Sequence, residues 1–195
     1  MTEEAASIPL FPLTAHVLPG GRLPLRIFEP RYLKMVTDSL SNQTYFGMCM
    51  LNSGPDRQSV SIHPIGTLVE IIDFMSLDGG LLGIIVEGIQ RFRILDFTPD
   101  KDDLYWGDVS LLPNWCQHKA PNNDPVINKL ASLYHKCPEL GELYPTHHLD
   151  DISWVCQRWL EILPITAKEK QSLLNMDSHV YTHHYLLKLL SENET

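Results

Sequence analysis

The spacing of apolar residues changes once along this 195-residue chain, and that change most constrains its fold. Up to residue 113, short apolar runs alternate with Gly, Pro, Asn and Asp, which is typical of β-strands joined by turns. From residue 126 onward, apolar residues recur every three or four positions, which indicates helices. The sequence therefore predicts an α+β protein: a β-rich subdomain over residues 1–113, a linker over 114–125 and an all-helical bundle over 126–195.

The first subdomain is predicted to be a small, partly closed β-barrel with one helix, because closure reduces the number of exposed strand edges. Asp78-Gly79-Gly80 lies between two apolar runs, and glycine there supplies the positive φ that a hairpin turn needs. The predicted strands are Ile8–Leu10, Leu23–Phe28, Tyr45–Leu51, Ile65–Phe74, Leu81–Glu87, Phe92–Phe97 and Tyr105–Leu112.

The helix of this subdomain is predicted to begin at Glu29-Pro30, since proline is favoured in a first helical turn. Its inward face is expected to hold Tyr32, Leu33, Val36 and Leu40.

In the second subdomain, Asp150 or Asp151 is expected to cap the most regular helix, and Thr166 with Glu169 forms a capping box. The inward residues are predicted to be Ile127, Leu130, Ala131 and Tyr134 before Cys137-Pro138, then Ile152, Val155, Cys156, Trp159, Leu160 and Leu163, and finally Val180, Leu187 and Leu190. A stripe of Trp154, Trp159 and Tyr185 is interpreted as core rather than as a binding face.

The charge of the chain limits its partners. Twenty-four acidic and 15 basic residues give a net charge of −9, which opposes binding to nucleic acid or to anionic lipid. No apolar run approaches the roughly 20 residues of a membrane helix, and the acidic start MTEEAAS is unlike a secretory signal. We therefore expect a cytoplasmic protein with no membrane partner.

No metal or other cofactor is expected. The four cysteines are dispersed and are interpreted as reduced thiols. A zinc site from Cys116, His118, His135 and Cys137 is the weaker alternative, because one-residue spacings fit poorly around a tetrahedral ion. His179 and His183 have the i, i+4 spacing of a metal pair, but no acid follows in a suitable place, so solvated or half-buried rings are the favoured interpretation.

Motifs of the common catalytic classes are missing from the sequence. There is no GxxxxGK[ST] phosphate loop, no GxSxG nucleophile turn and no HExxH metal motif. A hydrolase built on His and Asp residues would still need a nucleophile, and no sequence motif here identifies one. The prediction is that the chain is not an enzyme.

Six segments in order resemble the amino-terminal substrate-binding domain of Lon proteases. They are IPLFPL at 8–13, VLPGGRLPLRIFEPRYLKMV at 17–36, FGM at 46–48, IGTLVEI at 65–71, DGGLLGIIVEGIQRFRI at 78–94 and LPITAKEKQSLLNMD at 163–177. The resemblance covers nearly the whole chain and implies a PUA-like barrel followed by a helical bundle, in a form without the ATPase and protease domains. A departure follows residue 177, where the family tends to show an arginine-leucine pair and this chain has Tyr181-Thr182 and His183-His184.

The function implied by the resemblance is non-catalytic binding of unfolded, misfolded or damaged polypeptides, as an adaptor in protein quality control that works with a protease or chaperone. The alternative is an RNA-binding PUA-like module, which the negative charge opposes. Tentative peptide-binding residues are Leu10, Phe11, Leu23, Leu25, Phe74 and Met75.

A second tentative site is the polar cluster of Arg26, Glu29 and Arg31. Two guanidinium groups can clamp a carboxylate, but an ion-pair cluster that locks the strand-to-helix corner is the stronger interpretation. The same structural interpretation applies to Arg91 and Arg93 beside Gly88.

Overall fold

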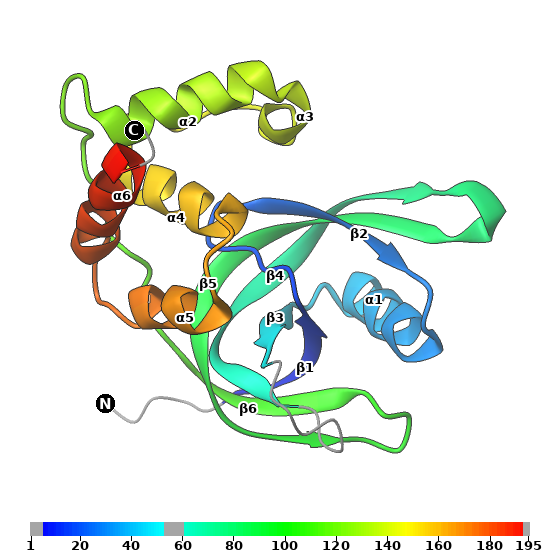
Figure 1. Ribbon diagram of the computed structural model, residues 1–195. Helices are drawn as coiled ribbons and strands as arrows, with labels where there is room; N and C mark the ends of the chain where they lie inside the picture. Colours follow the sequence, from blue (N-terminus) through cyan, green and yellow to red (C-terminus); the bar gives the residue numbers. More distant parts are fainter. Residues whose placement is uncertain (1–5, 53–60, 193–195) are drawn as a thin grey trace. The chain divides into compact units, whose positions relative to one another are not determined.

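The structure is a computed structural model that describes residues 6–52 and 61–192, and its chain forms two compact units, residues 1–113 and residues 114–195 (Figure 1). Within residues 6–52 and 61–113, the first unit holds six strands, one helix and a short 3-10 turn. They are β1 (Ala6–Leu13), β2 (Arg22–Ile27), α1 (Pro30–Asn42), β3 (Phe46–Leu51), β4 (Ile62–Ser76), η1 (Asp78–Gly80), β5 (Leu82–Pro99) and β6 (Tyr105–Leu111). The α+β class predicted from the sequence is confirmed.

The strands of the first unit form a mixed sheet in the order β2-β5-β4-β3-β1-β6, and β6 also pairs with β5. Five strands, β5, β4, β3, β1 and β6, therefore form a closed ring, while β2 adds to the first half of β5. The β1–β3 pair is parallel and the other ladders are antiparallel.

One continuous strand, β5, replaces two predicted strands, Leu81–Glu87 and Phe92–Phe97, so that prediction was wrong. Gly88 lies between them, but it stays in the ladder opposite Val69 instead of making a turn. A Cβ atom at Gly88 would lie 2.2 Å from the carbonyl oxygen of Leu18. Gly88 therefore allows the backbone of Leu18 to approach β5 closely. A glycine in the sequence does not by itself distinguish this role from a turn.

The turn between β4 and β5 agrees with its prediction. Gly79 and Gly80 have φ angles of 77° and 76°, which glycine adopts without the steric cost of a side chain. The backbone of Leu77 donates a hydrogen bond to the Leu81 carbonyl across this turn, at 2.8 Å. Figure 1 shows the resulting long β4–β5 hairpin.

Helix α1 begins at Pro30, as the sequence predicted, and ends before Gln43, which has a left-handed backbone with φ 51°. Its buried residues are Tyr32, Met35, Val36 and Ser39. Leu40 is exposed, so the predicted inward face was wrong there. The buried face passes through Met35 and Ser39, three and seven residues after Tyr32, and this rotation leaves Leu40 outside.

Among the described residues of the first unit, two clusters of buried hydrophobic side chains form its core. In one, α1 packs against strand residues, and the rings of Tyr32 and Phe11 lie 4.2 Å apart between centroids. The other takes one buried residue from each strand of the ring, namely Leu10, Cys49, Leu68, Phe92 and Val109.

The second unit holds the helices α2 (Pro125–Lys136), α3 (Pro138–Gly141), α4 (Ile152–Ile162), α5 (Ala167–Leu174) and α6 (Val180–Glu192). Asp151 caps α4 by accepting a hydrogen bond from Ser153 N, and the capping box of Thr166 and Glu169 begins α5; both agree with the sequence. Helix α6 differs, because Val180 is exposed while Thr182 and Leu186 are buried. Val180 was therefore wrongly placed inward.

The tryptophans of the second unit belong to its core. Trp154 and Trp159 are buried, which confirms their interpretation as core residues, and Tyr185 is half-buried. Trp159 Nε1 donates to the Val126 carbonyl at 2.9 Å, and the buried Trp115 donates to the Met176 carbonyl at 2.8 Å. The indole N–H groups of Trp115 and Trp159 thus have the partner that a buried polar atom requires.

Candidate functional site

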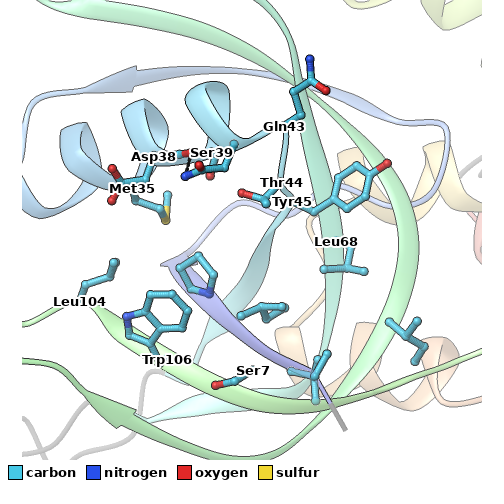
Figure 2. A pocket seen from close by; sticks show the side chains of 16 residues that line it. Ser7, Met35, Asp38, Ser39, Gln43, Thr44, Tyr45, Leu68, Leu104 and Trp106 are labelled. Atoms are coloured by element: carbon cyan, nitrogen blue, oxygen red, sulfur yellow. Dashed lines mark hydrogen bonds between the residues drawn. The ribbon is translucent and has the colours of Figure 1, made fainter. Parts of the chain in front are cut away.

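A concave apolar surface of the first unit lies between α1 and the strands β1 and β6 (Figure 2). We call it the α1 groove; its volume is about 840 Å³, within the range of roughly 300–1,000 Å³ common for ligand pockets. Most side chains on its walls are apolar, including Ile8, Pro9, Met35, Leu104 and Trp106.

The walls of the α1 groove follow from local structure. Met35, Asp38, Ser39 and Asn42 line it because positions i, i+3, i+4 and i+7 share one helix face. The opposite wall depends on the β1–β6 ladder, in which Pro9 pairs with Trp106.

Two aromatic side chains of the α1 groove are unusually accessible. Tyr45 is 46% exposed and Trp106 is 39% exposed, and both line the groove, as does the exposed Leu111. Exposed apolar residues that gather in one concave surface mark a binding site more often than scattered ones do.

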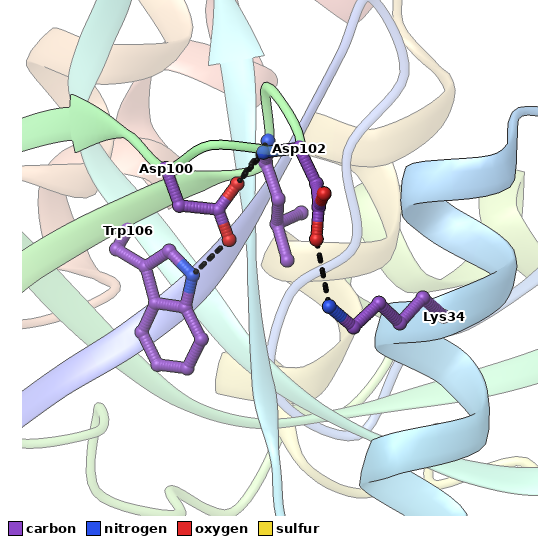
Figure 3. Close-up of polar contacts among 5 residues, drawn as sticks. Lys34, Asp100, Asp102 and Trp106 are labelled. Atoms are coloured by element: carbon purple, nitrogen blue, oxygen red, sulfur yellow. Dashed lines mark hydrogen bonds and ion pairs between the residues drawn. The ribbon is translucent and has the colours of Figure 1, made fainter.

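An aspartate holds Trp106 in place (Figure 3). Asp100 Oδ2 accepts a hydrogen bond from Trp106 Nε1 at 3.3 Å, and Oδ1 accepts from the backbone N–H groups of Asp102 and Leu104 at 2.8 and 3.1 Å. Desolvation raises the pKa of Asp100, but these hydrogen bonds outweigh it and leave the pKa below its usual range. An ionised carboxylate therefore orients the indole.

The loop that carries Asp100 is tied to α1. Lys34 Nζ contacts Asp102 Oδ2 at 2.7 Å (Figure 3). In addition, Arg31 Nη1 donates to the Asp103 carbonyl at 2.9 Å. These contacts connect the helix wall of the α1 groove to the strand wall.

A smaller hollow of about 380 Å³ continues the α1 groove. The two share Ser39, Gln43, Thr44 and Tyr45, and the smaller one adds the exposed Leu40 together with Glu70 and Ile71. Tyr45 therefore stands between two adjoining hollows.

The six tentative peptide-binding residues lie outside both hollows. Leu10 and Phe11 are buried in the two cores, and Leu23 and Leu25 are half-buried against the first core. Phe74 and Met75 are 66% and 42% exposed on β4. The ladders place Leu25 and Phe74 on the two strands that flank Ile84 of β5.

The second tentative site divides into a pair and a separate residue. Glu29 Oε2 contacts Arg31 Nη2 at 2.7 Å and Nε at 2.9 Å, and the Arg31 guanidinium also lies 4.7 Å from the centre of the Tyr32 ring. Arg26 is exposed and is not part of this pair. Elsewhere, Arg91 is buried and donates to the Pro113 carbonyl.

The histidines at metal spacing have other partners. His179 Nδ1 lies 2.9 Å from Ser153 Oγ, and His183 Nε2 lies 2.8 Å from Asp124 Oδ2. Within residues 6–52 and 61–192, no group of three or more His, Cys, Asp or Glu side chains could hold a metal ion. In the same ranges, no helix has the length and apolar character to cross a membrane.

Tyr45 and Trp106 were not among the site residues predicted from the sequence. A signal for Trp106 was present, because strand alternation places it on the same face as Asp108, where a solvated side chain is expected. Tyr45 carries no comparable signal, since it follows a helix end whose position is set by Gln43.

Comparison with known proteins gives a consistent result. A family model described as the ATP-dependent protease La (LON) substrate-binding domain matches residues 7–192. Lon protease of Dictyoglomus thermophilum is 25% identical over 140 residues, which cover 71% of this chain and 17% of that protein. Lon protease of Rhizobium meliloti is 26% identical over 189 residues, 90% of this chain and 23% of that protein. The chain thus spans less than a quarter of either relative.

Solved structures agree. The crystal structure of a Lon N-terminal domain protein from Xanthomonas campestris has a TM-score of 0.70 and 30% identity, over 95% of this chain and 98% of that one. The N-terminal domain of Mycobacterium avium complex Lon protease has a TM-score of 0.63 and 17% identity over the same shares, which supports the fold.

Proposed function

Because this chain belongs to the Lon substrate-binding domain family, we propose that it binds unfolded or damaged polypeptides without catalysing a reaction on them, and that the α1 groove holds their apolar side chains. The observation that carries this proposal is the concave apolar surface with exposed Tyr45 and Trp106. An apolar groove without a deep specific pocket suits ligands that share hydrophobicity rather than one sequence.

The binding energy in this proposal is mainly hydrophobic. Each apolar side chain that leaves water contributes roughly 1.5–3 kcal/mol before the cost of ordering the bound segment. A few such side chains in the two hollows give modest, sequence-tolerant affinity. The exposed pair Phe74 and Met75 is a second, separate contact surface in this proposal, since methionine adapts to varied partners.

The proposed cellular role is that of an adaptor in the cytoplasm, which presents bound polypeptides to a protease or chaperone. The barrel is proposed to be PUA-like. RNA binding is not favoured, because the net charge of −9 opposes the gathering of phosphates.

The test is a fluorescence anisotropy titration of the full chain with a labelled, permanently unfolded model protein. Trp106→Ala and Tyr45→Ala should each weaken binding about fivefold, the effect of a contact worth about 1 kcal/mol. Tyr181→Ala is the matched control, because Tyr181 is 61% exposed on α6 and lies outside the groove. Phe74→Ser measures how much the second contact surface, Phe74 and Met75, contributes to the binding free energy.

Two outcomes would contradict the proposal. If the wild-type chain shows no binding at tens of micromolar, the proposed function is wrong. If binding persists but Tyr45→Ala and Tyr181→Ala have equal effects, the α1 groove is not the contact surface.

A further inference from the structure

The charges around the two hollows are one-sided. Asp38 lines the larger hollow and Glu70 lines the smaller one, and among the residues that the structure describes neither lining contains a lysine, arginine or histidine. An occupant therefore meets mostly apolar walls in the larger hollow and one carboxylate in each hollow.

The neighbouring cations of α1 are already engaged by other acids. Lys34 contacts Asp102 at 2.7 Å, and Arg31 contacts Glu29 at 2.7 Å. Within the part of the chain that the structure describes, neither Asp38 nor Glu70 forms an ion pair with a lysine or arginine. Lys34 lies one helical turn before Asp38 and interacts with it electrostatically, but its direct contact is with Asp102, so the Asp38 and Glu70 carboxylates can still contact a cation from outside.

The aromatic residues of the groove also favour a cation. The faces of Tyr and Trp rings attract lysine and arginine; Tyr45 lines both hollows, Trp106 lines the larger one, and both side chains are accessible. The ionised Asp100, bonded to the Trp106 N–H, adds negative charge at the indole edge. An acidic segment would meet like charge at each of these points.

We propose that the two joined hollows select one class of polypeptide segment: an extended stretch with large apolar side chains flanked by Lys or Arg. Segments flanked by Asp or Glu bind weakly. This inference rests on the proposed function and adds to it a charge preference, which comes from Asp38 and Glu70. Apolar side chains supply the affinity, and the flanking charges supply the discrimination.

The size of the preference follows from the exposure of the groups. An exposed ion pair changes a binding constant roughly 1.5- to 5-fold. Attraction strengthens the binding of a basic flank and repulsion weakens that of an acidic flank, so both effects widen the difference in affinity between the two. With two carboxylates, we expect Lys-flanked segments to bind about tenfold more tightly than Glu-flanked ones at low salt. The preference should shrink at high salt, because the screening length falls to about 3 Å near 1 M.

The experiment compares three short peptides with the same apolar centre, flanked by Lys, Ser or Glu, in titrations with the full chain. Asp38→Asn and Glu70→Gln should each reduce the Lys-to-Glu affinity ratio severalfold while leaving the Ser-flanked peptide nearly unchanged. Glu142→Gln is the matched control. Glu142 is an exposed residue of the second unit and does not line either hollow, so its substitution removes the same charge from the protein and leaves the groove intact. It should leave the ratio unchanged.

The outcomes separate the two proposals. If none of the peptides binds, the proposed function fails together with this inference. If all three bind equally well, the proposed function stands and the charge preference is overturned. If the ratio falls equally in Glu142→Gln and Asp38→Asn, net charge rather than the groove carries the preference, and the inference is again overturned.

Discussion

Arg158 and Glu161 form a buried ion pair on α4, and we predict that Glu161→Gln destabilises the second unit. Arg158 Nε and Nη2 contact the two Glu161 oxygens at 2.7 and 2.9 Å, with side-chain exposures of only 1% and 11%. The guanidinium also lies 5.1 Å from the centre of the Trp154 ring and 5.7 Å from that of Tyr144. The charge therefore has close partners on several sides.

The magnitude follows from the cost of breaking a buried pair, about 3–5 kcal/mol when one partner is removed. Glutamine keeps an oxygen that can accept from Arg158, so the lower end, about 3 kcal/mol, is expected. For a unit of this size, 1 kcal/mol corresponds to about 4–8 °C in Tm, so Tm should fall by about 12–24 °C.

Urea unfolding followed by tryptophan fluorescence measures this cost. Three of the four tryptophans, Trp115, Trp154 and Trp159, lie in residues 114–195, so a Trp106→Phe background makes the signal specific to the second unit. The comparison set is Glu161→Gln, Arg158→Met and the double variant, all in that background. The double variant should cost less than the sum of the single ones, because it removes both charges.

A loss below about 1 kcal/mol for Glu161→Gln would refute this reasoning. So would strict additivity of the two single variants, because contacting charges that stabilise each other must show a coupling energy.

Two further predictions concern the first unit and the thiols. Gly88→Ala should lower the free energy of unfolding by about 1–3 kcal/mol, because the added Cβ would lie 2.2 Å from the Leu18 carbonyl oxygen. Thermal or urea unfolding measures this loss, and an unchanged unfolding transition would contradict the close approach. In a thiol-reagent assay at mildly alkaline pH, the exposed Cys116 should react in the native protein, while Cys49 and Cys156 react only after unfolding; rapid labelling of all three without denaturant would show that the two are not buried. Burial raises the pKa of the Cys49 thiol to about 12, and it also raises the pKa of the Cys156 thiol above its usual range. Both shifts disfavour the reactive thiolate.

Local signals in the sequence were enough to predict most helix ends and the main hairpin. Pro30, Asp151 and the Thr166 capping box act through bonds or dihedral limits within a few residues, so the sequence contains the whole cause. The continuity of β5 through Gly88 was not predictable in this way. Its cause is the backbone of Leu18, seventy positions earlier, which the fold brings against the strand.

The candidate site was harder to predict than the fold, because apolar composition alone does not separate core from exposed surface. Leu10-Phe11 and Phe74-Met75 are similar in sequence character, yet the first pair is buried and the second is exposed. The α1 groove depends on ladder register, which sets Pro9 opposite Trp106 across almost a hundred residues. Such register is a long-range property of the sheet.

The sheet edges of the first unit support binding through side chains rather than through strand addition. Closure of the ring by the β5–β6 pair removes many edges. Within the described residues, the sides that pair with no named strand include those of β2 and of the outer part of β4, together with β1 before Leu10 and β5 after Arg93. Pro24 lies in β2 and lacks the N–H that an added strand would need. In β4, Asp73 Oδ1 accepts from Phe74 N at 2.8 Å, which occupies a donor. An added strand would therefore find few free backbone partners on the edges of β2 and outer β4, which agrees with the proposal that polypeptides bind through the exposed side chains of the α1 groove.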